Sequence, residues 1–139
     1  MRYLIYHSTA LVEEGSDASR RILHASLRNN EAQAITGFLH REDDIFLQYI
    51  EGPAAAIEAL WRLLRTDRRH TDVTLVTWKP LLMRRFSTWT MGYTSRDAIS
   101  FREYLEGESG KSDLSDVTPD EALVFLRDAC QMVDRSVRL

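Results

Sequence analysis

The chain has 139 residues, a length that fits one domain with a few appended elements. Hydrophobic residues make up 44% and charged residues 28%, close to globular averages, which excludes a wholly disordered or fibrous chain. The formal net charge of -3 argues against a protein that grips nucleic acid through its phosphates, so we expect no direct nucleic-acid binding.

The sequence also bears on the cellular compartment. The single cysteine, Cys130, cannot form an internal disulfide, and the N-terminal stretch MRYLIYHSTALVEEGSD lacks the pattern of a secretory signal. Charges interrupt even the most apolar stretch, AAAIEALWRLLR, which falls short of the roughly 20 apolar residues that span a bilayer. We therefore expect a cytoplasmic protein that does not bind membranes.

The first predicted elements are a strand and a helix. Residues 2–8 (RYLIYHS) are aromatic and β-branched, which favours a strand. A helix is predicted from about Ala18, with Ser16 or Asp17 as its N-cap and the Asn29–Asn30 pair at its end.

A hairpin is predicted next, because the strand-like segments 34–40 (AITGFLH) and 45–52 (IFLQYIEG) flank the acidic run REDD. Side-chain alternation places Gln48 on one face with Phe46 and Ile50, although both faces of this strand are apolar. A buried amide without a partner would cost about 1 to 3 kcal/mol. Gln48 must therefore bond to protein, to water or to a ligand.

A second helix is predicted after Pro53, where apolar residues recur at helical spacing. The stripe consists of Ile57, Leu60, Trp61 and Leu64. Further strands are predicted over 72–82 and 88–94. The order βαββαββ predicts an α+β, ferredoxin-like fold: a mixed five-stranded sheet with two helices on one face.

Residues 96–139 are expected to form a C-terminal extension outside the domain of residues 1–95. Within it, residues 106–117 (EGESGKSDLSDV) suggest an exposed linker, and Thr118 with Glu121 matches a capping box at the start of a helix. The apolar stripe of this helix consists of Leu123, Leu126, Cys130 and Val133. We expect the stripe to pack on the domain or on another subunit.

Common catalytic signatures are missing from the sequence. The four histidines show no close metal-ligand spacing, so no metal site is expected. The motifs GxGxxG, GxxxxGK[ST] and GxSxG do not occur. We expect no enzymatic activity and no segment that forms a cyclase or phosphodiesterase.

Three polar side chains in apolar surroundings stand out: Tyr6, Asn30 and Gln48. Each has a purely structural interpretation, respectively as a core tyrosine, a helix C-cap and a hydrogen-bonded strand residue. Together they suggest a polar-lined slot.

Six segments between residues 2 and 95 match one known family in order and spacing. They are YHS (6–8), RNN (28–30), ITGFLH (35–40), FLQYIEGP (46–53), DRRH (67–70) and RRFSTWTMG (84–92). These segments resemble the BLUF domain, a flavin-binding blue-light sensor. The tail lies outside the resemblance, and the chain departs from many relatives at His40 and at Asp43–Asp44 in the hairpin.

The resemblance implies roles for particular residues. Tyr6 corresponds to the family's redox-active tyrosine, Gln48 to its switching glutamine and Asn30 to its flavin-holding asparagine, while Trp89 and Met91 correspond to the pair that transmits the switch. Further implied flavin-binding residues are Ile22, Ser26, Asn29, Phe46, Ile50, Arg65, Asp67, Arg69 and His70. The basic run RLLRTDRRH also fits a solvated helix end, and Trp89 and Met91 also fit ordinary core packing.

The resemblance implies a photoreceptor that binds FAD, with FMN or riboflavin as alternatives, and signals by contact with a downstream protein. A homodimer or higher oligomer is expected from the apolar stripe of the tail. Two alternatives remain: a flavin-binding redox protein that works without light, and a ferredoxin-like interaction module without a cofactor.

Overall fold

The computed structural model describes residues 1–86, 91–110 and 113–138, except for the side chains of Leu23, Ser26, Leu27 and residues 134–138. Its strands are β1 (Arg2–Ala10), β2 (Thr36–Glu42), β3 (Ile45–Gly52), β4 (His70–Pro80) and β5 (Gly92–Ser95). Its helices are α1 (Asp17–Ala32), α2 (Ala54–Thr66), α3 (Phe101–Ser109), the 3-10 helix η1 (Leu114–Asp116) and α4 (Pro119–Arg138). Among these described residues, no helix is long and apolar enough to cross a membrane.

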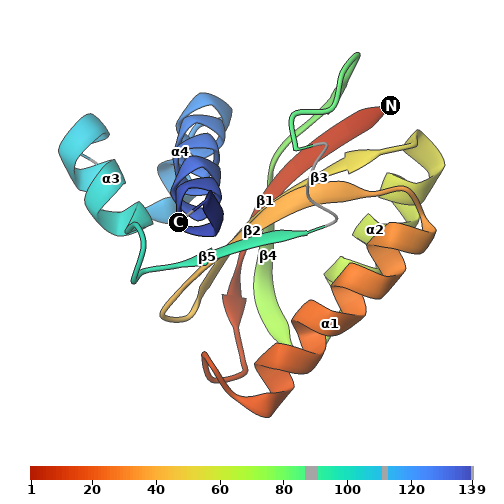
Figure 1. Cartoon of the computed structure of the whole chain (residues 1–139), viewed down its shortest axis with the longest axis horizontal. Helices are drawn as coiled ribbons and strands as arrows, with labels where there is room; N and C mark the ends of the chain where they lie inside the picture. Colours follow the sequence, from red (N-terminus) through yellow and green to blue (C-terminus); the bar gives the residue numbers. More distant parts are fainter. Residues whose placement is uncertain (87–90, 111–112, 139) are drawn as a thin grey trace.

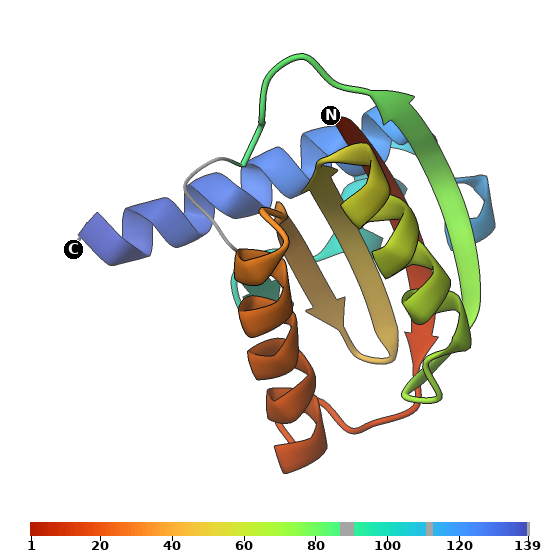
Figure 2. The ribbon, with the colours of Figure 1, turned by 90° about the vertical axis from the view of Figure 1, so that its right-hand side faces the viewer.

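Within the described residues, five strands form one sheet in the order β4-β1-β3-β2-β5. Neighbouring strands run antiparallel, except that β5 lies parallel to β2 at the edge. Helices α1 and α2 cover one face of this sheet, and α3 and α4 cover the other (Figures 1 and 2). The predicted α+β, ferredoxin-like arrangement with a mixed sheet is confirmed.

Side chains along the central strands point alternately to the two faces of the sheet, and both sets are mainly apolar. On the side of α1 and α2 the buried cluster includes Leu4, Tyr6, Phe46, Ile50 and Ile57. On the side of α3 and α4 it includes Tyr3, Ile5, Tyr49, Phe101 and Phe125. The predicted assignment of Gln48 to the face of Phe46 and Ile50 is confirmed.

The predicted ends of α1 and of the hairpin strands need correction. Ser16 is the N-cap of α1, as predicted, but the helix continues past Asn29–Asn30 to a C-cap at Gln33. The structural interpretation of Asn30 as a C-cap is therefore wrong. The hairpin is antiparallel, as predicted, but β2 extends to Glu42 because Asp43 takes a left-handed conformation that makes the turn tight.

The tail is more ordered than predicted. Residues 106–109 of the expected linker belong to α3, which the sequence interpretation missed and which buries Phe101 and Leu105. The capping box of α4 is confirmed, since the Thr118 and Glu121 side chains each accept from the other's backbone N–H. Helix α4 packs on the sheet, as expected for its apolar stripe. Leu126 of the predicted stripe is fully buried, and Leu123, Cys130 and Val133 are partly buried against the same core, to which Ala122, Phe125 and Ala129 are added.

Candidate functional site

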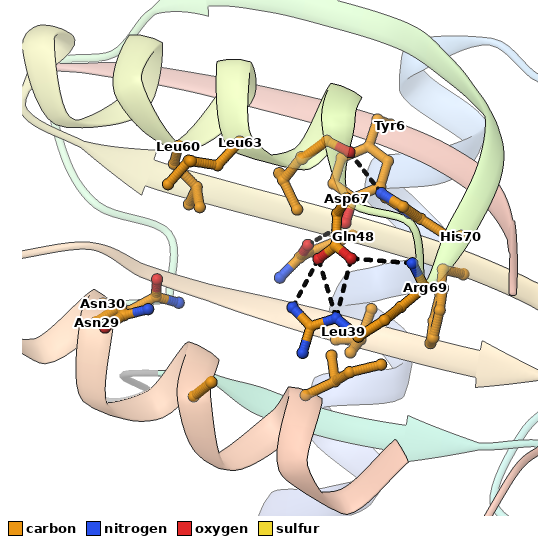
Figure 3. A pocket seen from close by; sticks show the side chains of 14 residues that line it. Tyr6, Asn29, Asn30, Leu39, Gln48, Leu60, Leu63, Asp67, Arg69 and His70 are labelled. Atoms are coloured by element: carbon orange, nitrogen blue, oxygen red, sulfur yellow. Dashed lines mark hydrogen bonds and ion pairs between the residues drawn. The ribbon is translucent and has the colours of Figure 1, made fainter. Parts of the chain in front are cut away.

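A pocket opens between α1 and α2 on the face of the sheet that carries Gln48 (Figure 3). Its space, counted together with the solvent at its mouth, is about 780 Å³. The lining residues are Tyr6, Ile22, Ala25, Asn29, Asn30, Leu39, Phe46, Gln48, Leu60, Leu63, Leu64, Asp67, Arg69 and His70.

Gln48 lies in a chain of three buried side chains. The antiparallel register of β1 and β3 places Tyr6 directly opposite Gln48. The Tyr6 hydroxyl donates to Gln48 Oε1 at 2.5 Å, and Gln48 Nε2 donates to Met91 Sδ at 3.3 Å. Both ends of the amide thus have partners, and a thioether is a weak acceptor. The polar residue in this apolar strand connects β1 with the segment that leads into β5.

Tyr6 is held as a hydrogen-bond donor. Burial raises the pKa of its phenol far above the ordinary value, and the negative charge of Asp67 raises it further. Its ring packs against Trp61 at 5.8 Å and edge-on against His70 at 6.1 Å, measured between ring centroids. The phenol therefore keeps its proton over the physiological pH range, with the Gln48 oxygen as its acceptor.

Asn30 offers a free donor inside the pocket. Its side chain is buried, and Nδ2 has no hydrogen-bond partner among the described residues. A buried amide donor without a partner is costly, so it is expected to bond to a ligand or to water. The edge of a flavin ring presents a carbonyl acceptor beside an N–H donor, which a carboxamide complements. The residues of the pocket therefore fit a flavin.

Charged and polar groups gather where α2 ends and β4 begins (Figure 3). Arg69 Nη2 lies 2.6 Å from Asp67 Oδ2, and its hydrogen bonds hold the pKa of the Asp67 carboxyl below the ordinary value, against the effect of burial. His70 Nε2 donates to the Leu64 carbonyl at 2.5 Å, and its Nδ1 lies 2.8 Å from Ser8 Oγ. These bonds fix the polar end of the pocket.

The structure brings most of the predicted site residues together. Those that line the pocket are Tyr6, Ile22, Asn29, Asn30, Phe46, Gln48, Asp67, Arg69 and His70. Ile50 is instead fully buried in the core beside the pocket, and Arg65 is exposed outside the lining. Trp89 and the side chain of Ser26 lie outside the described residues.

Several apolar lining residues were missed or given another role. Ala25 lies one helical turn from both Ile22 and Asn29, a spacing that places it on the same face of α1. Leu39 pairs with Gln48 across β2 and β3, but its partner is known only once the register is known. The remaining such residues, Leu60, Leu63 and Leu64, come from α2. Among the described residues, no group of three potential metal ligands was found.

The sequence is similar to known light sensors. A family model described as "BLUF: Sensors of blue-light using FAD" matches residues 1–92. The photoactivated adenylate cyclase subunit beta of Euglena gracilis is 38% identical over 80 residues, which is 57% of this chain and 9% of that protein. A subunit beta-like protein FB of the same organism is 41% identical with the same coverage. The match thus spans about a tenth of the length of these relatives.

Solved structures with the same fold include proteins of similar size. BlrB, described as a BLUF protein in its dark state, superimposes with a TM-score of 0.73 at 27% identity, covering 97% of this chain and 96% of BlrB. The ground state of BlsA gives a TM-score of 0.78 at 22% identity, with 92% and 86% of the two chains covered.

Proposed function

This chain belongs to the BLUF family, and we propose that it reports blue light to a protein partner by rearranging the hydrogen bonds of Tyr6 and Gln48. As a member of that family it is a blue-light sensor that uses a flavin. The observation that carries the proposal is the buried chain from Tyr6 through Gln48 to Met91. This chain borders a pocket in which the Asn30 donor has no partner among the residues that the structure describes.

The pocket residues have separate tasks in this proposal. The Asn30 carboxamide would hold the edge of a flavin ring, Ile22 and Phe46 would supply apolar walls, and Asp67 with Arg69 lies at the polar end of the pocket. A bound flavin supplies the absorption of blue light and a transient acceptor for an electron and a proton. We propose FAD, the flavin in the family description, with FMN and riboflavin as alternatives.

Tyr6 and Gln48 perform the switch. Tyr6 is the donor of an electron and a proton, and Gln48 Oε1 is the atom that its hydroxyl faces. Rotation or tautomerism of the amide exchanges its donor and acceptor ends without changing its volume. After such an exchange an acceptor faces the Met91 sulfur, which has no hydrogen to donate. The contact between Gln48 and Met91 is then lost.

The output is proposed to be a contact and not a reaction. Residues 1–95 form the sensing domain, and residues 96–139 offer the surface for a downstream protein and for a homodimer or higher oligomer. The chain itself is proposed to catalyse no reaction, although similar domains occur in photoactivated adenylate cyclases. We place it in the cytoplasm, without contact to membranes or nucleic acid.

The visible absorption spectrum of the purified protein, in the dark and after blue light, tests this function. We expect a flavin spectrum that shifts slightly to the red and returns in the dark. A flavin spectrum that does not respond to light would favour a redox protein. A colourless protein that takes up no added flavin would favour an interaction module without a cofactor.

A further inference from the structure

A second buried polar cluster lies on the opposite side of the sheet from the pocket. His40 and Glu42, both on β2, are fully buried and face α3 and α4. His40 Nε2 lies 3.1 Å from Glu42 Oε1, and His40 Nδ1 lies 2.8 Å from the hydroxyl oxygen of Thr94 on β5. Burying an ionisable pair in this way contributes little stability by itself, so its position calls for another explanation.

Glu42 holds the N-terminus of α3. Its carboxylate accepts from the backbone N–H groups of Phe101 at 2.7 Å and Arg102 at 3.3 Å, and from the Ser100 hydroxyl at 2.9 Å. The first N–H groups of a helix have no partner within the helix, and a negative charge there is favourable. The Ser100 hydroxyl in turn accepts from the backbone N–H of Glu103, so a side chain from the sheet and the local N-cap together hold the start of α3.

The donor and the acceptor in each hydrogen bond of His40 can be assigned. Burial acts to raise the pKa of the Glu42 carboxyl, but the hydrogen bonds from His40 and from the start of α3 outweigh it and hold the pKa low. The carboxylate can only accept, so His40 Nε2 carries a hydrogen and donates to it. Burial lowers the pKa of His40, which keeps the ring neutral, and Nδ1 then accepts from Thr94.

The His40 ring also contacts the last helix. It lies edge-on against Phe125 of α4, with 4.8 Å between the ring centroids. One side chain thus connects β5 with α3, through Glu42, and with α4 directly. Figure 1 shows β5 at the edge of the sheet, and the chain continues from β5 into α3.

We propose that His40 and Glu42 couple β5 to the position of α3 and α4, so that the state of Gln48 reaches the tail through Thr94. Met91, which accepts from Gln48, is the residue before β5. Thr94 lies within β5, three residues after Met91. Strand β5 is short and pairs with β2 alone within the described residues, where His40 is the partner of Thr94. This inference rests on the proposed light switch.

Hydrogen exchange at the start of α3, measured by NMR on the full chain in the dark and under blue light, tests the coupling. In the wild type, light should speed exchange of the Phe101 and Arg102 amides by about two- to tenfold, the range that corresponds to one hydrogen bond. Thr94→Val removes the hydroxyl that His40 accepts from but keeps the shape of the side chain. It should keep the visible red shift and lose the light effect on exchange.

Two further variants separate coupling from general damage. Thr94→Ser keeps the hydroxyl and should restore the light effect. Thr77→Val changes a buried threonine of β4 in the same sheet and should behave like the wild type.

The possible failures point to different steps. A wild type that shifts to the red without a change in exchange at α3 would overturn the coupling and leave the photoreceptor function intact. A full light effect in Thr94→Val would also overturn it. A wild type without any red shift would refute the proposed function, and the coupling with it.

Discussion

An amide side chain such as that of Gln48 presents a donor and an acceptor of nearly equal size, so their exchange alters bonding without altering packing. In the structure the acceptor faces Tyr6 and the donor faces Met91. Tyr6 can reverse its hydroxyl and accept from the exchanged amide, but the Met91 sulfur cannot donate. The exchange therefore preserves a hydrogen bond to Tyr6 but breaks the one to Met91. The change in bonding is thus passed to the segment that leads into β5.

Gln48→Leu and Tyr6→Phe should each bind flavin and lose the reversible red shift. The first removes the amide and the second removes the proposed electron donor, while both nearly preserve side-chain volume. The check is the absorption difference between lit and dark samples. Tyr3→Phe is the matched control, because it removes a hydroxyl from the other face of β1 and should cycle normally. Normal cycling of Tyr6→Phe would refute its role as donor.

Asn30→Leu should have opposite effects on the flavin-free protein and on flavin binding. The buried Nδ2 lacks a partner among the described residues, so its removal should raise the free energy of unfolding of the flavin-free protein by about 1 kcal/mol. Loss of the hydrogen bonds to the ring should weaken flavin binding roughly tenfold. Urea denaturation and fluorescence titration measure the two quantities. Unchanged flavin affinity would show that Asn30 does not hold the ring.

At the level of elements, the strands and α4 could be predicted because their signals are local. Alternation in residues 45–52 indicates a strand with two apolar faces, and Thr118 with Glu121 indicates a helix start. Helix α3 was missed although its sequence carries local signals, since Ser100 caps it by accepting from the backbone N–H of Glu103 and Gly110 ends it in a left-handed conformation. Only the additional bond from Phe101 to Glu42, 59 residues earlier, depends on the fold. No pattern within residues 101–109 reveals a carboxylate supplied by another strand.

The polar residues of the site could be predicted from the sequence, but its apolar lining could not. Tyr6, Asn30 and Gln48 could be named because polar side chains stand out in apolar segments and match a family in spacing. Leu39 and Ala25 could not be distinguished from core residues, because their place in the pocket depends on strand register and helix packing. Arg65 was named from the family resemblance, but it is exposed and does not line the pocket.

Alanine substitutions at two glycines should change the free energy of unfolding in opposite directions. A Cβ at Gly37, on β2, would lie 2.1 Å from the backbone oxygen of Tyr49, so Gly37→Ala must push β2 and β3 apart. We expect a loss of about 3 kcal/mol or more in the free energy of unfolding. Gly107, inside α3, has open space around it, and Gly107→Ala should add about 0.5 to 1 kcal/mol. Denaturant titration of both variants measures this, and a neutral Gly37→Ala would contradict the tight pairing.

At the level of the whole molecule, one sheet separates two different environments. Helices α1 and α2 lie on the side of the proposed flavin site, and α3 and α4 lie on the opposite side (Figure 2). On that opposite side the helices cover aromatic side chains and the buried His40 and Glu42. The strands are common to both sides. A change in hydrogen bonds on one face can therefore reach the other through the edge strand β5, without any movement of the central strands.

The buried ionisable groups should make stability depend on pH. Burial lowers the pKa of His40 below the ordinary 6.5, so the unfolded chain binds this proton more readily. The free energy of unfolding should therefore be highest above 6.5 and fall as the pH drops through that value. His7 acts in the same direction, and Glu42, with its lowered pKa, adds a further loss below its ordinary 4.5.

Denaturant titrations across this pH range measure the dependence. His40→Gln should flatten the curve around pH 6.5. An identical slope in His40→Gln and the wild type would show that His40 binds its proton equally well in both states.

The measurement that most directly tests the account is the light-minus-dark infrared spectrum of protein whose glutamine side-chain carbonyls carry a carbon-13 label. We predict an isotope-sensitive amide band that shifts with light, returns in the dark with the visible spectrum and is missing from Gln48→Leu. Because Gln33 and Gln131 lie outside the pocket lining, their carbonyls should contribute no light-dependent band. A visible red shift without any change in a labelled glutamine band would contradict the central role of Gln48.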